Sequence, residues 1–137
     1  MSMNWAEDMN RMHKKYGAHE AVDKLTREQL KAFLQFRIRF LQEELDELKE
    51  AATPNQPVDS EEVVDALIDL CVVAIGTLDL FEVNGYEAWN EVLMANLNKK
   101  VGIKESRPNP FGLPDLIKPD GWKAPSHEGN HGKLKDL

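Results

Sequence analysis

Residues 43–69 read EELDELKEAATPNQPVDSEEVVDALID, and this stretch decides the fold. It holds ten carboxylates and one base, Lys49, a net of −9 in a chain of 137 residues whose formal net charge is −7. The other 110 residues therefore sum to +2, and the acidity is local. A Thr53-Pro54 step divides the stretch, and a residue before proline disfavours the helical conformation. The step therefore predicts the end of one helix before the start of the next.

On both sides of this stretch the sequence predicts helices, and hence an all-α fold. The expected helices cover residues 4–16, 26–52, 61–83 and 86–101. Thr26 is a good N-cap because its side-chain oxygen can accept a backbone N–H of the first turn, and Asp59 or Ser60 can do the same for the third helix. Glycines typical of helix C-termini follow three of the helices: Gly17, Gly85 and Gly102. No segment has a convincing strand pattern.

The last 36 residues differ in composition. They hold five of the seven prolines and five of the eight glycines, which disfavours a long regular element. Apolar side chains that a disordered tail rarely needs are also present: Phe111, Leu113, Leu116, Ile117 and Trp122. We therefore divide the chain into a helical domain, 1–101, and a non-regular arm, 102–137, that packs on the domain or on a neighbouring subunit. Residues 107–125 are expected to be extended and residues from 127 onward to be loose.

Composition excludes several classes of protein. The single Cys71 rules out an intramolecular disulfide and a cysteine-based zinc site. The N-terminus lacks the apolar segment of a secretory signal, and the longest apolar run, 66–80, is interrupted by two aspartates and is short for a bilayer span. A net negative charge disfavours nucleic acid and anionic membranes as partners. We expect a cytoplasmic protein.

Six of the carboxylates are expected to point inward. At about 100° per residue, three glutamates of the second helix fall within roughly 100° of one another, beside three phenylalanines. Three acids of the third helix share roughly 60°, and apolar residues continue that arc. The six inward carboxylates are Glu43, Glu44, Glu47, Glu62, Asp65 and Asp69. Lys49, the nearest base, points away from them.

Buried carboxylates need compensating positive charge. A buried, unpaired carboxylate is costly, so a site neutralises it with a proton, a partner or a metal ion. Oxygen ligands without His or Cys favour Mg²⁺, Mn²⁺ or Ca²⁺. A di-iron bundle would need Glu-x-x-His pairs, but none of the four histidines lies on the two acidic helices. A solvated acidic surface remains the alternative.

Two blocks on these helices carry a family resemblance. Glu43-Glu44-x-x-Glu47, fourteen further residues and then Glu62-x-x-Asp65 resemble the signature of the MazG-like all-α nucleotide pyrophosphohydrolases. This superfamily includes the dimeric dUTPases and the phosphoribosyl-ATP pyrophosphohydrolases. Asn96-x-x-Lys99 is similar to an element that ends the last helix in many members. Two further segments are similar to parts of short, often phage-encoded members: Met12-His13-x-x-Tyr16-Gly17 and Gly121-Trp122-Lys123. Asp69 extends the minimal signature, so it could act in an outer shell.

The resemblance implies a four-helix-bundle-like fold completed by oligomerisation, as a dimer or a tetramer. It implies hydrolysis of a nucleoside or deoxynucleoside triphosphate to the monophosphate and pyrophosphate, with two or more Mg²⁺ or Mn²⁺ ions per site. The six carboxylates would hold metal, and Glu44 or Glu47 would act as the base. Asn96 and Lys99 would contact phosphate or ribose. The residues implied for the base pocket are Trp5, Met9, Met12, His13 and Gln35.

Two other functional classes stay open at this point. A helical module of this kind could bind a nucleotide for regulation without turnover. A plain helical dimerisation domain, with the acids serving solubility, is the third reading, and the angular placement of the carboxylates argues against it.

Overall fold

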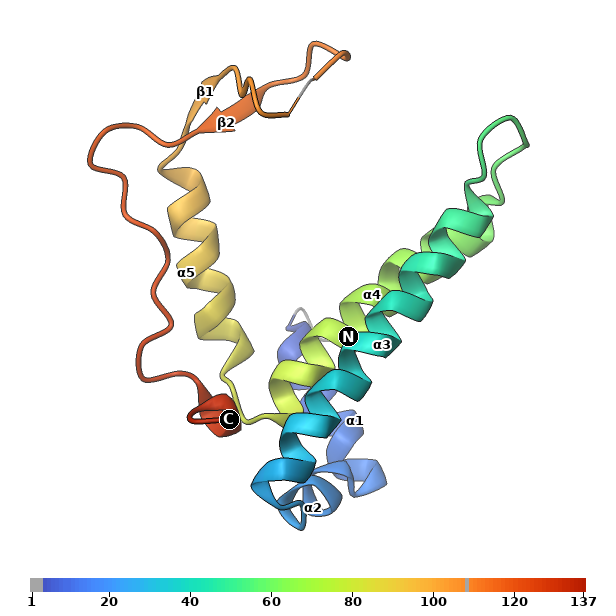
Figure 1. Cartoon of the computed structure of the whole chain (residues 1–137), viewed down its shortest axis with the longest axis vertical. Coiled ribbons are helices and arrows are strands. Elements are labelled where there is room, and N and C mark those ends of the chain that lie inside the picture. The colour runs from blue at the N-terminus through green and yellow to red at the C-terminus, as the bar shows by residue number, and fades with distance from the viewer. Residues whose placement is uncertain (1–3, 108) are drawn as a thin grey trace. The chain divides into compact units, whose positions relative to one another are not determined.

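The computed structural model describes residues 4–107 and 109–137 (Figure 1). Within these residues the helices in chain order are α1 Trp5–Tyr16, α2 Ala18–Asp23, α3 Arg27–Ala51, α4 Ser60–Leu80 and α5 Gly85–Leu97. The shorter elements are the strands β1 Lys100–Gly102 and β2 Asp115–Ile117, and a 3₁₀ turn, η1, at Gly132–Leu134. The predicted all-α class is confirmed.

The described chain divides into two units. One consists of residues 4–85 together with 131–137, and the other of residues 86–130. None of the helices in 4–107 and 109–137 combines the length and the apolar character that a membrane crossing requires.

Local capping chemistry places the helix starts where the sequence predicts them. Thr26 Oγ1 accepts the Gln29 N–H at 3.2 Å, and the Gln29 side chain accepts the Thr26 N–H at 2.8 Å, which is a reciprocal capping box at the start of α3. The Asp59 carboxylate caps α4 by accepting the Glu62 N–H at 3.2 Å. Gly17, with φ 69°, ends α1 in the left-handed region that favours glycine.

Two predicted helix ends are wrong. α4 ends at Leu80 rather than near residue 83, because Glu82 takes up a left-handed conformation with φ 59° that a helix cannot continue. Gly85 consequently begins α5 instead of ending α4. α5 then ends at Leu97 rather than near residue 101, because the next residues pair as a strand.

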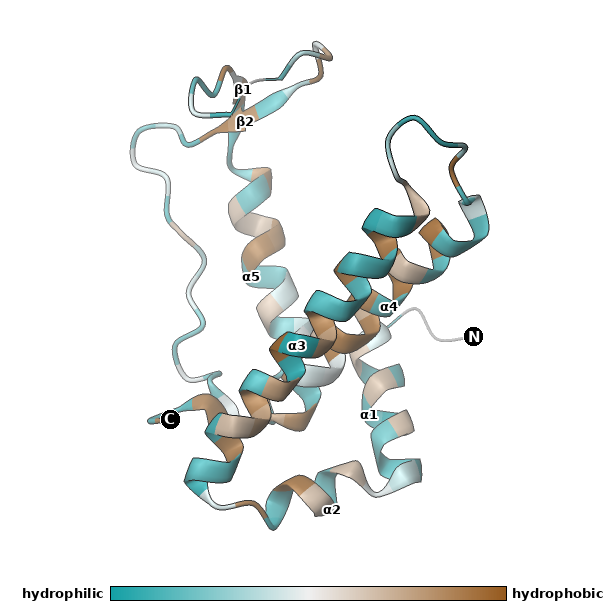
Figure 2. Cartoon of the chain, turned by 45° about the vertical axis from the view of Figure 1, so that its right-hand side comes forward, coloured by the Kyte–Doolittle hydropathy of each residue, from teal (hydrophilic) through white to brown (hydrophobic). Residues whose placement is uncertain are grey.

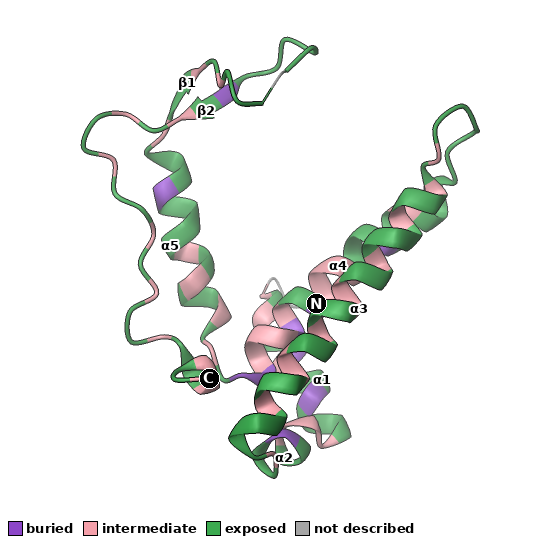
Figure 3. Cartoon of the chain, in the orientation of Figure 1, coloured by how far each residue is buried: buried purple, intermediate pink, exposed green. Residues whose placement is uncertain are grey.

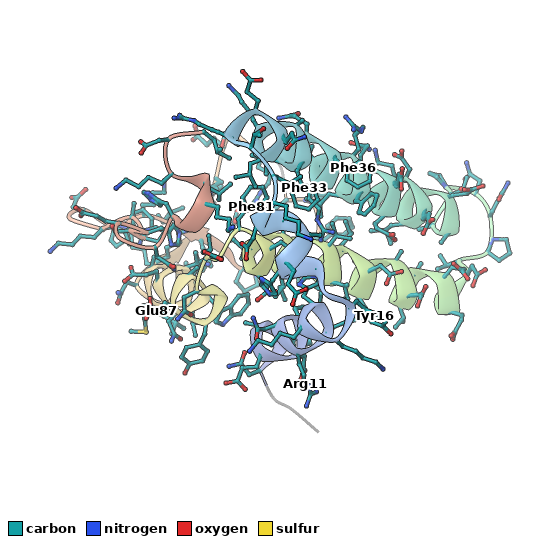
Figure 4. All side chains as sticks on the ribbon, turned by 90° about the horizontal axis from the view of Figure 1, so that it is seen from below. Arg11, Tyr16, Phe33, Phe36, Phe81 and Glu87 are labelled. Carbon is teal, nitrogen blue, oxygen red and sulfur yellow. The ribbon has the colours of Figure 1, made fainter. Side chains whose placement is uncertain are left out.

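The first unit is organised by the antiparallel packing of α3 on α4, with α1 against the other side of α4 (Figure 1). At one end of this helix pair Phe33 stacks on Phe81, with ring centroids 5.7 Å apart (Figure 4). One turn further along α3, Arg37 crosses to α4, where its Nε donates to Thr77 Oγ1 at 2.9 Å and its Nη2 to the Val73 carbonyl at 3.0 Å. The core of this unit contains Met9, Val22, Ala66, Val73, Leu80 and Phe81.

The burial expected for α3 and α4 is only partly found. α4 is central, since it packs on α3, α1 and α2. However, no residue of α3 is fully buried, so the side chains of this helix that the sequence predicts to point inward are at most partly covered in the single chain (Figure 3). An apolar strip of α4 is also exposed, at Val64, Leu67 and Ile68. The helical wheel identified apolar faces correctly, but it could not show which of them another element covers.

The second unit contains a small antiparallel ribbon that the sequence did not predict. β1 pairs with β2 in the register Lys100↔Ile117, Val101↔Leu116 and Gly102↔Asp115. A Cβ at Gly102 would collide with the Ile117 side chain, so a larger residue there would force that side chain to move. The arm beyond the ribbon is anchored on α5, where the Trp122 indole N–H donates to the Ala95 carbonyl at 2.7 Å.

The expectation that residues from 127 onward are loose is also wrong. The Lys133 N–H donates to the Phe81 carbonyl at 2.6 Å, and the Lys133 ammonium pairs with Asp23. Gly132, at φ 52°, passes so close to the Phe81 carbonyl that a Cβ would not fit. The C-terminal residues therefore pack on the end of α4.

Phe81→Ala should lower the free energy of unfolding by about 3–5 kcal/mol, because it empties the position of a fully buried ring. Phe111→Ala is the matched control, since Phe111 is 80% exposed, and it should change stability by no more than about 0.5 kcal/mol. Urea unfolding followed by far-ultraviolet circular dichroism measures both. Equal losses in the two variants would contradict this packing.

Candidate functional site

Antiparallel packing brings together acidic residues that lie far apart in the sequence. Glu44 of α3 interacts electrostatically with Glu47, one turn further along the same helix, and with Asp65 and Asp69, which lie one turn apart on α4. The four residues are named the carboxylate cluster here. The structure thus gathers four of the six carboxylates that the sequence singled out.

Glu44 is the centre of the carboxylate cluster. Burial raises the pKa of its carboxyl group, and the charges of Glu47 and Asp69, a hydrogen bond with Glu47 and the charge of Asp65 raise it further. Its Oε2 atom is buried and has no hydrogen-bond partner in the described chain. A buried acceptor surrounded by like charge is costly, so this position favours a cation.

The exposure of the other carboxylates differs from the inward orientation that the sequence predicts. Asp69, like Glu44, is partly buried, whereas Glu47 and Asp65 are exposed. The last two of the six, Glu43 and Glu62, are exposed as well. Figure 1 gives the reason within this unit, since α3 and α4 extend toward their connecting loop beyond α1.

The donor set of the carboxylate cluster fits a hard divalent cation. It offers carboxylate oxygens alone, which are the ligands preferred by Mg²⁺ and Mn²⁺. Its oxygens are not drawn into a tight group, however. Within residues 4–107 and 109–137, a different group brings three potential metal-ligating atoms within 4.8 Å of one another. It consists of His13, His19 and Asp79.

This second polar group joins α1, α2 and α4, and the sequence did not predict it. Asp79 Oδ2 lies 2.6 Å from His13 Nδ1 and 2.8 Å from His19 Nε2. The Asn10 amide donates to the other carboxylate oxygen of Asp79 at 2.9 Å. The available signal was Asp79 itself, because a carboxylate inside an apolar run of a central helix needs partners.

The five residues predicted for a base pocket separate into two groups. Met9 and His13 are buried and converge on Gly76, where a Cβ would lie 3.0 Å from Met9 Cε and 3.3 Å from His13 Cε1. Arg37 Nη2 lies 3.1 Å from the same point, and burial lowers the pKa of its guanidinium. The other three are exposed: Trp5, Met12 and Gln35. Their role in binding a base stays a prediction.

The two residues predicted to contact phosphate or ribose belong to the second unit. Asn96 is exposed on the last turn of α5. Lys99 follows that helix, and its Nζ lies 5.4 Å from the centre of the Trp122 ring. Phosphate contact by these residues stays a prediction.

Comparison with known proteins decides the family. The phosphoribosyl-ATP pyrophosphohydrolase family (PRA-PH) matches residues 11–96, which is more than half of the chain and includes all six carboxylates. The chain belongs to this family. PRA-PH is part of the MazG-like nucleotide pyrophosphohydrolase superfamily, so the resemblance drawn from the acidic motif is confirmed. No curated protein and no solved structure matches the chain.

Membership of the PRA-PH family places the chain among the hydrolases that act as pyrophosphohydrolases. The family is in general metal-dependent, which agrees with the oxygen donors of the carboxylate cluster. The match ends at Asn96, so Lys99 and the arm that carries Trp122 lie outside it.

Glu44→Gln should raise the melting temperature of the metal-free protein by a few degrees, because it removes a charge that burial and its neighbours disfavour. The raised pKa means that the folded chain binds this proton more tightly than the unfolded chain. The destabilisation is therefore full above the folded pKa, and the gain from glutamine should vanish as the pH falls below the ordinary value of 4.5.

Glu43→Gln is the control for this measurement, because Glu43 neighbours Glu44 on α3 but is exposed. It should leave the melting temperature in EDTA nearly unchanged at each pH. A Glu44→Gln variant that melts with the control, or below it, would show that the cluster is not electrostatically strained.

Proposed function

We propose that this chain hydrolyses a nucleoside or deoxynucleoside triphosphate to the monophosphate and pyrophosphate, and that the reaction requires Mg²⁺ or Mn²⁺. The observation that carries the proposal is the carboxylate cluster around the strained Glu44, in a chain that belongs to a pyrophosphohydrolase family. The carboxylate cluster alone would repel a polyphosphate, so bound cations are needed before a triphosphate can bind at the cluster itself.

The carboxylates would hold two or more divalent ions. When bound, such ions neutralise charge on the triphosphate and lower the pKa of a bound water. The ligands in this proposal are Glu43, Glu44, Glu47, Glu62, Asp65 and Asp69. Exposed Glu47 and Asp65 leave this side of the α3–α4 pair open to solvent, so a substrate can reach it.

The reaction also needs a group that accepts a proton from the attacking water. Glu44 and Glu47 are the candidates for this base, because they interact with each other and lie within the carboxylate cluster. Asn96 and Lys99 would contact phosphate or ribose, and the N-terminal helix would contact the base.

Incubation with a panel of ribonucleoside and deoxynucleoside triphosphates, scored for pyrophosphate release, tests the proposal. We expect release with Mg²⁺ or Mn²⁺ and none in excess EDTA. Glu47→Gln and Asp65→Asn should each lower kcat/KM by a hundredfold or more, on the order expected when a general base or metal ligand is lost. Circular dichroism should show unchanged helix content.

Asp46→Asn is the matched control for these variants. Asp46 is the residue before Glu47, and it is exposed and bonded to Gln42 on the same helix at 2.9 Å. It should keep wild-type turnover. Full turnover in EDTA would refute the metal requirement, and binding of a nucleotide without any pyrophosphate release would favour a regulatory module.

We also propose that the protein acts as a homo-oligomer, with a dimer as the unit and a tetramer as the assembly implied by the family resemblance. The single chain leaves large apolar side chains exposed on both central helices. Figure 2 shows hydrophobic residues along both of these helices. Those on α4 are Val64, Leu67 and Ile68, and those on α3 include Phe36, Ile38 and Leu45. An exposed apolar strip such as the one on α4 is typical of an interface.

Ile68→Asp should convert the oligomer to a monomer, because it places a charge within the exposed apolar strip of α4. Val58→Asp is the control, since Val58 is similarly exposed but lies in the loop between α3 and α4. Light scattering over a range of concentrations measures the mass. A wild-type mass that stays that of one chain at every concentration would refute oligomerisation.

A further inference from the structure

Two lysines flank the β1–β2 ribbon at the same end. The pairing ends at Lys100↔Ile117, and Lys99 directly precedes Lys100 while Lys118 directly follows Ile117.

The indole ring of Trp122 holds both ammonium groups. Lys99 Nζ lies 5.4 Å and Lys118 Nζ 5.0 Å from the ring centre. The ring itself is fixed, because its N–H donates to the carbonyl of buried Ala95 at 2.7 Å. A rigid platform of this kind positions both charges with little freedom.

The platform stabilises the lysines without neutralising them. A carboxylate partner would cancel an ammonium charge, whereas an aromatic face attracts it and leaves the net charge in place. No ion pair joins Lys99 or Lys118 to a carboxylate within residues 4–107 and 109–137. The two charges remain available to an anion.

The neighbouring base of the same ribbon behaves differently. Arg107 Nη2 pairs with Asp115 Oδ1 at 2.6 Å. Burial alone would raise the pKa of Asp115, but the Leu116 N–H and Arg107 outweigh it and hold the pKa below its ordinary value. Arg107 thus has a carboxylate partner within this unit. Within the described residues, Lys99 and Lys118 form no such ion pair.

We propose that Lys99 and Lys118, positioned by Trp122, form a binding site for the linked phosphates of the substrate and of the pyrophosphate product. This inference rests on the proposed hydrolysis, to which it adds Lys118 as a second phosphate-binding residue and Trp122 as a positioning residue. Two ammonium groups at one aromatic ring can each meet a different phosphoryl group, so they match a linked-phosphate chain better than a single phosphate.

Calorimetric titration of the full chain with inorganic tripolyphosphate and, separately, pyrophosphate at low ionic strength in EDTA tests the site directly. Lys118→Ala should weaken binding of both roughly tenfold, which corresponds to one lost charge-assisted contact. Lys118→Arg should restore most of the affinity. Lys123→Ala is the matched control, because Lys123 is an exposed neighbour of Trp122 in sequence, and it should bind as wild type.

The steady-state kinetics should show the same pattern. Lys118→Ala and Trp122→Ala should raise KM for the triphosphate roughly tenfold with kcat nearly unchanged. Trp122→Phe should recover most of the loss because it keeps an aromatic face. If circular dichroism shows that Trp122→Ala is misfolded, the KM values of Lys118→Ala and Trp122→Phe test the site instead.

The outcomes separate this site from the proposed function. Turnover by wild type with Lys118→Ala indistinguishable from Lys123→Ala in KM and in polyphosphate affinity would overturn the site alone. Lysine-dependent polyphosphate binding without pyrophosphate release from any triphosphate would overturn the hydrolysis and keep the anion site. A wild-type chain that binds neither polyphosphate would also overturn the site.

Discussion

The packing of α3 on α4 forces like charges together, and this constraint organises the first unit. At one end, the stacked Phe33 and Phe81 and the hydrogen bonds of Arg37 hold the two helices in register. That register then brings the carboxylates of α3 and α4 together at the other end, where a buried oxygen of Glu44 has no partner in the described chain. Apolar packing thus offsets an electrostatic cost that side chains alone do not relieve. A cation is the simplest group that would relieve it.

Much of the helical architecture could be predicted because its signals are local. Thr26 and Asp59 cap helices through side chains within three residues, and Gly17 ends a helix through its own backbone conformation. The ribbon was missed because its strands have three residues each, and their pairing depends on residues about fifteen positions apart. The packing of Lys133 on the Phe81 carbonyl is equally non-local. Neither leaves a periodic pattern in the sequence.

The site shows the same division between local and non-local information. Helical spacing was enough to place Glu44 and Glu47 on one face of α3 and the acids of α4 on one face of that helix. The family was identified from the resemblance of the acidic motif, and the match over residues 11–96 confirms it. Exposure could not be predicted, because it depends on which elements cover a face. The group of Asp79 with His13 and His19 was missed because it joins three helices. The approach of Lys99 and Lys118 to one Trp122 ring likewise joins residues that no sequence pattern connects.

Calorimetric titration of Mn²⁺ into the metal-free protein tests most directly whether the carboxylate cluster is a cation site. We expect Mn²⁺ to bind saturably to wild type and not to the double variant Glu44→Gln, Asp69→Asn. Asp46→Asn, an exposed acid of the same helix, should bind as wild type. A wild-type chain that binds no Mn²⁺, or a double variant that binds it as tightly as wild type, would show that the carboxylate cluster is not a cation site.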